Sequence, residues 1–408
     1  MKSSKSTHTT SKSISFIIFK TEMWTVIVLG DINHSPRMKN HIDMLQVDHD
    51  VQVIAYGSLN GVKSLSLPNF QIQKLYLLWS AIKFALQSIY LIYYLVFYPS
   101  KYILIQNPPS LPVLFALWFI KLFCTRVVIL DWHNLGYTIL KTRMDGAVVQ
   151  IYKKLENSLS RVADVHLTVS NEMKDFLENT WNLKNVKVLY DHPPELFKPF
   201  SENEKSNFWS ILSYYPECHI VGNISIDNVI KIVTGTSYTP DEDIFMLLEA
   251  LHLLDKHIKA DGIEIITFIT GRGPLRPIIE QKIKSLELKH VHICCVWLKY
   301  EDYPKLLALC DVGISLHYSS SGLDLPMKIW DMFGCGLPVF ALNYKALPEL
   351  VLKSYGYTFQ DANSLFQLLV SYKDGLLDLK TCSNEIIKDF KNKRWEKEWK
   401  DKMSEFIE

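Results

Sequence analysis

The chain has 408 residues, of which 48% are hydrophobic and 21% are charged, so it encodes a globular protein and not a largely disordered one. This length exceeds what one hydrophobic core usually serves, which favours two domains. The formal net charge is +1 and no local basic patch stands out, so composition gives no support for binding to nucleic acid.

Short apolar runs alternate with helical stretches through the first half of the chain. Several of these runs stop at a glycine, at an Asn-Pro-Pro sequence or at an aspartate, as buried strands of a parallel sheet do. The alternation is typical of a doubly wound α/β domain, predicted here over residues 23–195. The predicted strands are residues 24–29, 51–56, 102–106, 126–130, 165–169 and 186–190.

Three segments of this half differ from that pattern. Residues 1–22 are rich in Ser, Thr and Lys and contain an apolar patch, 14–19, that is too short to span a bilayer. Residues 75–98 and 111–124 are more apolar, although the first contains Lys83 and the second Lys121. Two interpretations stay open for this pair: buried or half-buried domain helices, or helices whose apolar face rests on a membrane surface.

The alternation restarts in the second half, after a less regular segment, 196–228, that is interpreted as a linker or insertion. A second α/β domain is predicted over 229–382, with strands at 229–234, 263–270, 291–296, 312–316 and 338–341. The final residues, 383–408, are charged, but Trp395 and Trp399 lie four apart and share one helix face, which predicts a helix that packs back onto the domains. Ligands of such domains bind at the carboxyl ends of the strands, so a site in a cleft between the two is expected.

The segment from Ser319 to Pro338 carries the strongest functional signal. A predicted strand runs into a Ser/Gly loop and then into a helix that starts near Pro326, and a helix N-terminus placed in this way binds anions. Lys328 lies in the first helical turn, where the helix dipole alone disfavours it, so a diphosphate beside it makes better sense. Asp331 follows on the same face, suited to ribose hydroxyls. The alternative is an ordinary turn with a solvated Lys and Asp.

This pattern resembles the donor-domain signature of GT-B glycosyltransferases, and further segments are similar to the chitobiosyldiphosphodolichol β-mannosyltransferases. The resemblance covers about residues 24–400, in order, in both predicted domains. Any single segment is a weak signal, whereas seven collinear ones are a strong signal. They are Val28–Met38, Gln106–Pro112, Asp131–Tyr137, Thr236–Asp243, Thr270–Arg276, Trp297–Leu307 and Ser319–Lys328.

The resemblance implies an α/β GT-B fold, in which two Rossmann-like domains face a cleft. It also implies an inverting transfer of mannose from GDP-mannose to the 4-hydroxyl of the outer GlcNAc of dolichol-linked chitobiose. This would occur on the cytosolic face of the endoplasmic reticulum membrane, with other mannosyltransferases of the same pathway as further candidate partners. No bound metal or other cofactor is implied. The Asp241-Glu242-Asp243 run has metal-binding spacing but is interpreted as the first turn of a helix, and the seven cysteines lack zinc-site spacing.

The matched segments supply the predicted donor-binding residues. Lys328, Arg272 and the backbone of the Ser319–Gly322 loop are the groups expected to stabilise the departing diphosphate. The full predicted set is Thr236, Ser237, Gly271, Arg272, Gly273, Ser320, Ser321, Gly322, Leu323, Lys328 and Asp331.

The residues that bind and deprotonate the acceptor are predicted less specifically than those of the donor site. The base that takes the proton from the acceptor hydroxyl should follow a strand of the first domain, and both His133 and Asp31 qualify. Arg37, Asn107 and Asn134 are the predicted acceptor-binding residues. Arg37 and nearby Lys39 are interpreted either as ligands of the lipid diphosphate or as solvated loop charges.

Three departures from the family pattern bear on the expectations. Asn33 replaces a glycine in the first loop, where it is expected to tolerate a left-handed backbone, and Tyr238 replaces a tryptophan while keeping an aromatic face. The family typically begins with a membrane-spanning helix, and this sequence shows no convincing one. Membrane association is therefore expected to depend on residues 75–98 and 111–124. Two alternative functions remain: a GT-B enzyme with another sugar or lipid acceptor, and a non-catalytic paralogue that acts as a scaffold.

Overall fold

The computed structural model describes residues 23–68, 76–239, 242–258 and 263–407, so the apolar patch at 14–19 lies outside the described residues. The chain divides into two compact units. One consists of Met1–Ile129 with Val162–Asp164, and the other of Leu130–Arg161 with Val165–Glu408.

The first seven strands form one sheet in the order β3-β2-β1-β4-β5-β6-β7. Neighbouring strands run parallel, as between β1 and β2 and between β1 and β4. All six predicted strands form, while β3 was not predicted because its sequence, KSLS, is short and polar. The strands are β1 (Met23–Asp31), β2 (Asp50–Tyr56), β3 (Lys63–Ser66), β4 (Tyr102–Asn107), β5 (Val127–Trp132), β6 (Val165–Thr168) and β7 (Val186–Val188).

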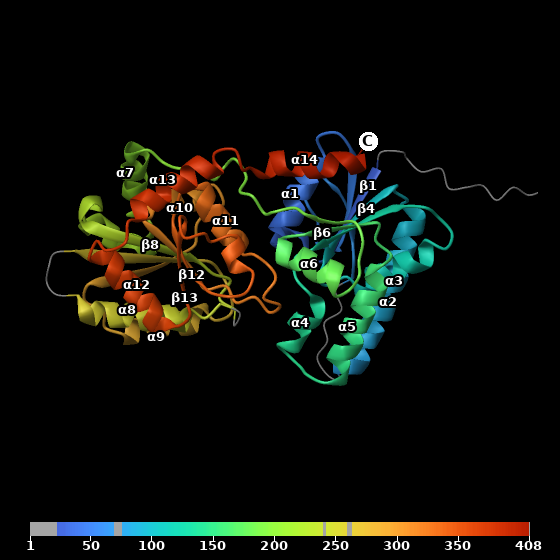
Figure 1. Ribbon diagram of the computed structural model, residues 1–408, viewed down its shortest axis with the longest axis horizontal. Helices are drawn as coiled ribbons and strands as arrows, with labels where there is room; N and C mark the ends of the chain where they lie inside the picture. Colours follow the sequence, from blue (N-terminus) through green and yellow to red (C-terminus); the bar gives the residue numbers. More distant parts are fainter. Residues whose placement is uncertain (1–22, 69–75, 240–241, 259–262, 408) are drawn as a thin grey trace, which may run out of the picture. The chain divides into compact units, whose positions relative to one another are not determined.

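Helices α1, α2 and α3 also belong to the first unit. Helix α1 (Pro36–Leu45) begins at a proline, which suits the first helical position because that N–H has no partner in any case. It lies on one face of the strands, and α2 (Tyr76–Phe97) and α3 (Leu111–Ile120) lie on the other (Figure 1). In the core, the ring of Trp24 stacks on that of Tyr102 with 4.7 Å between centroids.

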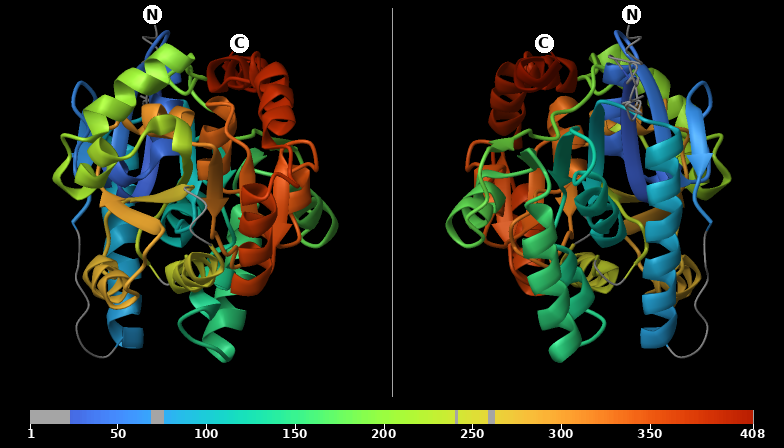
Figure 2. Two further views of the ribbon diagram at one scale, coloured as in Figure 1. Left: turned by 90° about the vertical axis from the view of Figure 1, so that its left-hand side faces the viewer. Right: turned by 90° about the vertical axis from the view of Figure 1, so that its right-hand side faces the viewer.

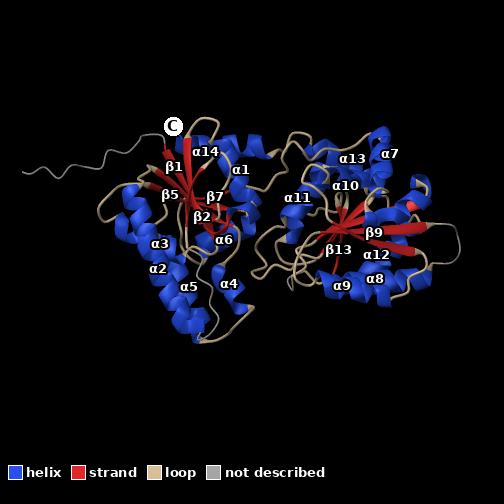
Figure 3. Ribbon diagram, turned by 180° about the vertical axis from the view of Figure 1, so that it is seen from behind, coloured by secondary structure: helices blue, strands red, loops and turns tan. Residues whose placement is uncertain are grey.

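The second sheet has six parallel strands in the order β10-β9-β8-β11-β12-β13. Only β13 was not predicted. Figure 3 shows helices on both faces of this sheet: α8, α9 and α12 on one, and α10, α11 and α13 on the other. The strands are β8 (Val229–Gly235), β9 (Glu264–Thr270), β10 (Val291–Val296), β11 (Val312–Ser315), β12 (Val339–Leu342) and β13 (Gly356–Phe359).

The remaining helices of the second unit lie between or after these strands. They are α4 (Gly136–Lys141), α5 (Ala147–Ser160), α6 (Asn171–Asn179), α7 (Glu202–Leu212), α8 (Ile244–His257), α9 (Arg276–Ser285), α10 (Tyr303–Leu309), α11 (Met327–Gly334), α12 (Ala362–Lys373), α13 (Leu379–Phe390) and α14 (Trp395–Ile407).

The segment predicted as a linker or insertion is largely helical. Helix α7 starts with a capping box in which the Ser201 hydroxyl accepts from the Glu204 N–H, and the Glu204 carboxylate accepts from the Ser201 N–H. Phe208 and Trp209 of this helix are buried in the core of the second sheet. The segment is therefore part of that core.

The C-terminal helix packs as its tryptophan spacing predicts. Trp395 and Trp399 are 2% and 4% exposed. The Trp395 N–H donates to the Pro193 carbonyl oxygen at 3.4 Å, and Lys187 at β7 pairs with Glu405. Helix α14 is thereby fastened to the β7 region within the second unit.

Candidate functional site

The loop at the centre of the predicted site runs from the end of β11 to the start of α11. Gly322 has a φ of 72° there, a left-handed conformation that other residues rarely adopt. The nearest atom that a Cβ on Gly322 would meet is the Cβ of Lys345 at 3.7 Å, so backbone conformation and not space requires glycine. The Ser319 hydroxyl accepts from the Gly322 N–H at 2.7 Å and closes the turn.

Asp324 is the buried acceptor around which this loop is organised. One carboxylate oxygen accepts hydrogen bonds from Asn134 Nδ2 at 3.0 Å, from the Ser319 hydroxyl, and from the Ser321 hydroxyl at 3.3 Å. The other oxygen lies 2.8 Å from His317 Nε2. Burying a carboxylate costs free energy unless hydrogen bonds compensate for the lost water. The conformation of the loop and the burial of Asp324 therefore support each other.

Two segments from earlier in the chain hold the same turn in place. After β5, Asn134 bonds to the Asp324 carboxylate, and the Thr138 hydroxyl lies 3.0 Å from that of Ser320. Before α6, the Ser170 hydroxyl donates to the carbonyl oxygen of Leu323. The predicted acceptor residue Asn134 and the predicted donor residue Ser320 thus belong to one cluster.

Lys328, in the first turn of α11, forms an ion pair with Glu242. The second oxygen of Glu242 accepts from the Thr236 hydroxyl at 2.9 Å and from the Ser237 N–H at 2.7 Å. Burial acts to raise the pKa of the Glu242 carboxyl, but the charge of Lys328 and these hydrogen bonds outweigh it and lower that pKa. The interpretation of Glu242 as part of a first helical turn is wrong, because α8 starts after it, at Ile244.

Gly271 and Gly273 allow the loop after β9 to pass against the loop after β8. A Cβ on Gly271 would lie 1.6 Å from the Thr236 carbonyl oxygen, and one on Gly273 would lie 1.7 Å from the Ser237 carbonyl oxygen. Only glycine fits at such distances, so these four predicted donor residues are neighbours. Tyr238, which replaces the family's tryptophan, is fully buried, and its aromatic ring belongs to the core of the second sheet.

Arg272 extends from the same loop into solvent. Its guanidinium carbon lies 4.4 Å from the centre of the Trp297 ring, in cation–π geometry, and the ring itself is exposed. The stacking orients the positive charge without burying it. The Arg272 N–H groups are consequently well suited to bind an anion.

Asp331 lies one turn after Lys328 and is half-buried. Burial and the nearby Asp191 raise the pKa of its carboxyl well above the ordinary value, against the opposing charge of Lys328. The Tyr303 hydroxyl and the Lys328 side chain both lie near Gly235, the last residue of β8. A Cβ on Gly235 would lie 3.3 Å from the hydroxyl oxygen and 3.5 Å from the Lys328 side chain. The end of β8 therefore brings a cation and a phenol together beside this carboxyl.

His133 follows β5 and pairs with a buried carboxylate. Its Nε2 lies 2.8 Å from Oδ2 of Asp131, whose side chain is fully buried, while 24% of the His133 side chain is exposed. A carboxylate in this position fixes the orientation of the ring and leaves Nδ1 as the nitrogen that can accept a proton. The next residue, Asn134, bonds to Asp324, so the pair adjoins the β11–α11 turn.

Asp31, the other predicted base, ends β1 in the first unit. It accepts hydrogen bonds from the backbone N–H and the side-chain amide of Asn33, both at 3.0 Å. The backbone hydrogen bond is the main cause of a lowered pKa for Asp31, which makes it a weaker base. The left-handed backbone expected at Asn33 is wrong, because this residue lies in a short 3-10 turn, Ile32–His34.

The other predicted acceptor residues also lie in the first unit. Arg37 and Lys39 are on α1, and Arg37 is 1% exposed, so its interpretation as a solvated loop charge is wrong. Asn107 is fully buried and its side-chain oxygen accepts from the Ser110 hydroxyl. Their contacts with an acceptor stay predictions.

Four site residues were not predicted as such: Glu242, Tyr303, His317 and Asp324. Two of them left a signal in the sequence, because Asp324 stands between leucines in a predicted loop and His317 directly follows a predicted strand. Glu242 and Tyr303 left none, since an acid before a helix and an aromatic residue at a helix start are both ordinary.

Comparison with known proteins gives a consistent result. The model of the family described as "Glycosyl transferases group 1" matches residues 229–372. The chain is 36% identical to the chitobiosyldiphosphodolichol beta-mannosyltransferase of Debaryomyces hansenii, over 95% of this chain and 88% of that one. It is 37% identical to that of Kluyveromyces lactis, over 93% and 88%. It is also 34% identical to the UDP-glycosyltransferase TURAN of Arabidopsis thaliana, over 92% and 95%.

Solved structures confirm the GT-B fold that the resemblance implied. A glycosyltransferase of Rickettsia africae superposes with a TM-score of 0.67 at 14% identity, covering 95% of this chain and 98% of its own. Anabaena HepE in complex with UDP gives 0.69 at 14% identity, with coverage of 95% and 99%. At such identities the likeness shows the fold alone.

We predict that Glu242→Gln lowers the free energy of unfolding near neutral pH by about 2 kcal/mol, because the Lys328 ammonium then faces a neutral amide. Since the folded-state pKa of Glu242 lies below its ordinary value of 4.5, its stabilising contribution is complete above that pH. The contribution is lost as the pH falls through the lowered pKa. Urea unfolding at a series of pH values measures the difference between wild type and variant.

The matched control is Glu249→Gln, an exposed residue on α8, which should leave stability unchanged at every pH. A difference between wild type and Glu242→Gln that stays constant well below pH 4.5 would contradict the prediction.

Proposed function

The chain belongs to the family of chitobiosyldiphosphodolichol beta-mannosyltransferases, and from this premise we propose that it moves mannose from GDP-mannose to chitobiose linked to dolichol diphosphate. It is a glycosyltransferase and a mannosyltransferase, the activity named for relatives between 32% and 38% identical to it. We assign the transfer as inverting, with a β-1,4 bond formed to the outer GlcNAc.

The cluster of positive groups at the ends of β8, β9 and β11 supports a diphosphate donor. The N-terminus of α11 presents N–H groups and the positive end of its dipole, and Lys328 adds an ammonium in the first turn. Arg272 adds a second, exposed cation from the β9 loop. A departing diphosphate gains negative charge as the bond to the sugar breaks, so these groups stabilise it most in the transition state.

Glu242 suits the same task indirectly. It holds the Lys328 ammonium at the end of β8 and orients the Ser237 N–H, so the donor meets groups already in position. We assign Asp331 to the ribose hydroxyls, and the backbone of the Ser320–Leu323 turn to the diphosphate.

The pairing with Asp131 favours His133 as the base. We propose that His133 Nδ1 takes the proton of the acceptor hydroxyl while the hydroxyl oxygen attacks the anomeric carbon and the bond to the diphosphate breaks. The buried Asp131 carboxylate then stabilises the imidazolium. Asp31 suits this role less well because two hydrogen bonds from Asn33 already stabilise its ionised form.

The first experiment is to incubate the purified full chain with GDP-mannose and a chitobiosyl-diphosphate lipid and to identify the product. A mannosylated lipid is expected. The relative named as a UDP-glycosyltransferase favours one specific alternative, a UDP-sugar donor, so a parallel reaction contains UDP-mannose or UDP-glucose. Product from a UDP-sugar alone would replace the proposed donor. Nucleotide binding without product from any donor would favour the scaffold hypothesis.

In this assay we predict that Lys328→Met lowers kcat/KM by about 100- to 1000-fold, because a cation that stabilises the leaving diphosphate is lost. The double variant Lys328→Met with Glu242→Gln removes both charges, avoids an unpaired buried carboxylate, and should show a comparable loss. The control Lys282→Met, an exposed lysine on α9, should behave as wild type. Near-normal turnover by a folded double variant would exclude Lys328 from the donor site.

For the base, we predict that His133→Gln lowers kcat by about 100- to 10,000-fold while the Kd for GDP is unchanged, because the residue handles a proton and not the nucleotide. Asp31→Asn should cost much less. The opposite order of the two losses, with GDP binding intact in both variants, would assign the base to Asp31.

The α2–α3 surface supports attachment to a membrane, as a dolichol-linked substrate requires. Residues 79–97 of α2 form a helix long and apolar enough to cross a membrane. Helix α3 packs beside α2 (Figure 2), and large apolar side chains of both helices, and of the turn that follows α3, are exposed. They include Ile89, Tyr93, Phe97, Trp118, Phe119, Leu122 and Phe123, of which Phe123 is 73% exposed.

This exposure favours the second interpretation of the two apolar segments, in which an apolar face rests on a membrane. The inward side of α2 is nonetheless part of the domain core, with Leu91 and Leu95 fully buried. We propose that this face rests on the cytosolic side of the endoplasmic reticulum membrane and brings the first unit to the lipid acceptor.

We predict that Trp118→Glu with Phe123→Glu weakens binding to phosphatidylcholine–phosphatidylinositol vesicles by at least about tenfold, because two aromatic side chains no longer enter the bilayer. The control is Val47→Glu with Leu376→Glu, since both residues are exposed and apolar but lie elsewhere. Sedimentation with vesicles measures the effect. An equal loss in both double variants would contradict a specific membrane face.

A further inference from the structure

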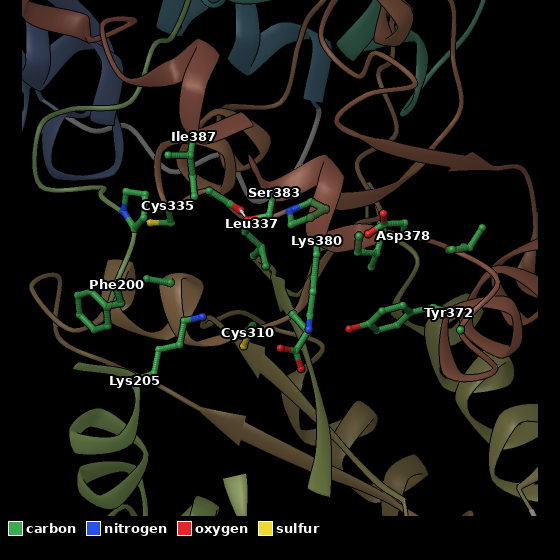
Figure 4. A pocket seen from close by; sticks show the side chains of 18 residues that line it. Phe200, Lys205, Cys310, Cys335, Leu337, Tyr372, Asp378, Lys380, Ser383 and Ile387 are labelled. Atoms are coloured by element: carbon green, nitrogen blue, oxygen red, sulfur yellow. Dashed lines mark hydrogen bonds between the residues drawn. The ribbon is translucent and has the colours of Figure 1, made fainter. Parts of the chain in front are cut away.

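A cavity of about 410 Å³ lies at the amino ends of β11 and β12, the edge of the sheet opposite to the proposed donor site (Figure 4). Its walls come from α7, from the residues just before the two strands, and from α12 and α13. The volume is in the range of small-molecule sites. No predicted donor residue lines it, and the function proposed above does not use it.

Three hydrogen-bond donors converge on this cavity from three different helices. Figure 4 shows Lys205 of α7, Tyr372 of α12 and Lys380 of α13 directing their polar ends into it. Lys380 lies two residues after Asp378, whose carboxylate also lines the cavity but caps α13 by accepting from the Thr381 N–H, and the charge of Lys380 helps to lower the pKa of that carboxyl. Lys205 pairs with the exposed Glu202 three residues away at 2.9 Å, and surface pairs of this kind are weak. Both ammonium groups can therefore bind an anion.

The Tyr372 hydroxyl remains a donor at neutral pH. Burial, together with the charge of Asp311, raises the pKa of Tyr372 well above its usual range. The phenol therefore keeps its proton and can donate a third hydrogen bond beside the two ammonium groups.

The same cavity also contains acceptors. Asp311 uses one carboxylate oxygen, Oδ2, to accept from the Lys231 N–H at 2.8 Å and to pair with the Lys231 ammonium at 3.0 Å. That ammonium offsets the charge of Asp311, and Oδ1 remains for the hydroxyls of a ligand. Ser383 lines the cavity too, and because its hydroxyl donates to the Gly336 carbonyl oxygen at 2.7 Å, its oxygen is left to act as an acceptor.

An apolar wall completes the lining. Phe200, Leu337 and Leu379 line the cavity beside these polar groups. A sugar ring has this mixed character, because its hydroxyls need acceptors while its C–H faces pack on aromatic and aliphatic side chains.

We propose that the cavity is a second ligand site, for a small phosphorylated sugar, separate from the donor site. Lys205, Lys380 and Tyr372 bind the phosphate, Asp311 and Ser383 accept from the sugar hydroxyls, and Phe200 packs on the ring. Cys335 and Gly336, which follow α11 directly, belong to the cavity wall, so the helix that carries Lys328 extends from one site to the other.

The test uses the full chain saturated with GDP, so that the donor site is filled before glucose 6-phosphate is titrated by calorimetry. Binding by the wild type is expected. Lys205→Met with Lys380→Met should weaken it by about 10- to 100-fold, through the loss of two charged hydrogen-bond donors. Lys388→Met, on α13 but outside the cavity, should bind as wild type. The wild type and the variants are also titrated with glucose 6-phosphate in the absence of GDP. A wild type that binds the sugar phosphate but not GDP would therefore count against the proposed function and not against this second site.

A second variant tests the same site in case the double lysine substitution disturbs folding. Ser383→Phe places a ring in the cavity and should abolish binding without altering GDP affinity. Inorganic phosphate and free glucose, titrated separately, should each bind at least tenfold more weakly than the sugar phosphate. No binding by the wild type would overturn the proposal. So would binding that neither variant affects, or inorganic phosphate that binds as tightly as glucose 6-phosphate.

Discussion

The burial of one carboxylate, that of Asp324, determines the shape of the turn on which the proposed donor site depends. Its hydrogen-bond donors come from three places: His317 after β11, Ser319 in the turn itself, and Asn134 in the loop after β5. A buried carboxylate must keep such partners, since the loss of even one leaves an expensive unpaired charge. The left-handed Gly322 and the start of α11 follow from this arrangement, and so does the direction in which the helix N-terminus points.

A second constraint is electrostatic. A lysine in the first turn of a helix is unfavourable for the helix dipole, and the protein balances it with Glu242, whose other oxygen orders the β8 loop. The glycines at 271 and 273 let the β9 loop approach that ordered backbone closely. Lys328 is therefore held in place by long-range contacts and not by its own helix, and this pre-organisation is what a site for a departing diphosphate requires.

The two units use apolar residues in different ways. In the second unit, apolar side chains on both faces of the sheet are gathered into cores that include α7, a segment whose sequence looks like a linker. In the first, α2 and α3 bury one side and leave large aromatic residues such as Trp118 and Phe123 exposed. Water-exposed protein surfaces rarely carry so many large apolar side chains together. The exposed face of α2 and α3 therefore fits an acceptor that is held in a membrane by its lipid.

The sequence by itself predicted every strand except β3 and β13, together with their parallel arrangement, because β-branched runs, glycines and helix starts are local signals. It also predicted Lys328, Asp331 and the glycine loops as site residues, because they carry recognisable spacing. It did not predict that Glu242 pairs with Lys328, 86 residues away, or that Asn134 bonds to Asp324, 190 residues away. Such pairs depend on how strands are ordered in a sheet and on which loops then meet. Only the tertiary structure decided them, because no local propensity records which distant side chain satisfies a buried charge.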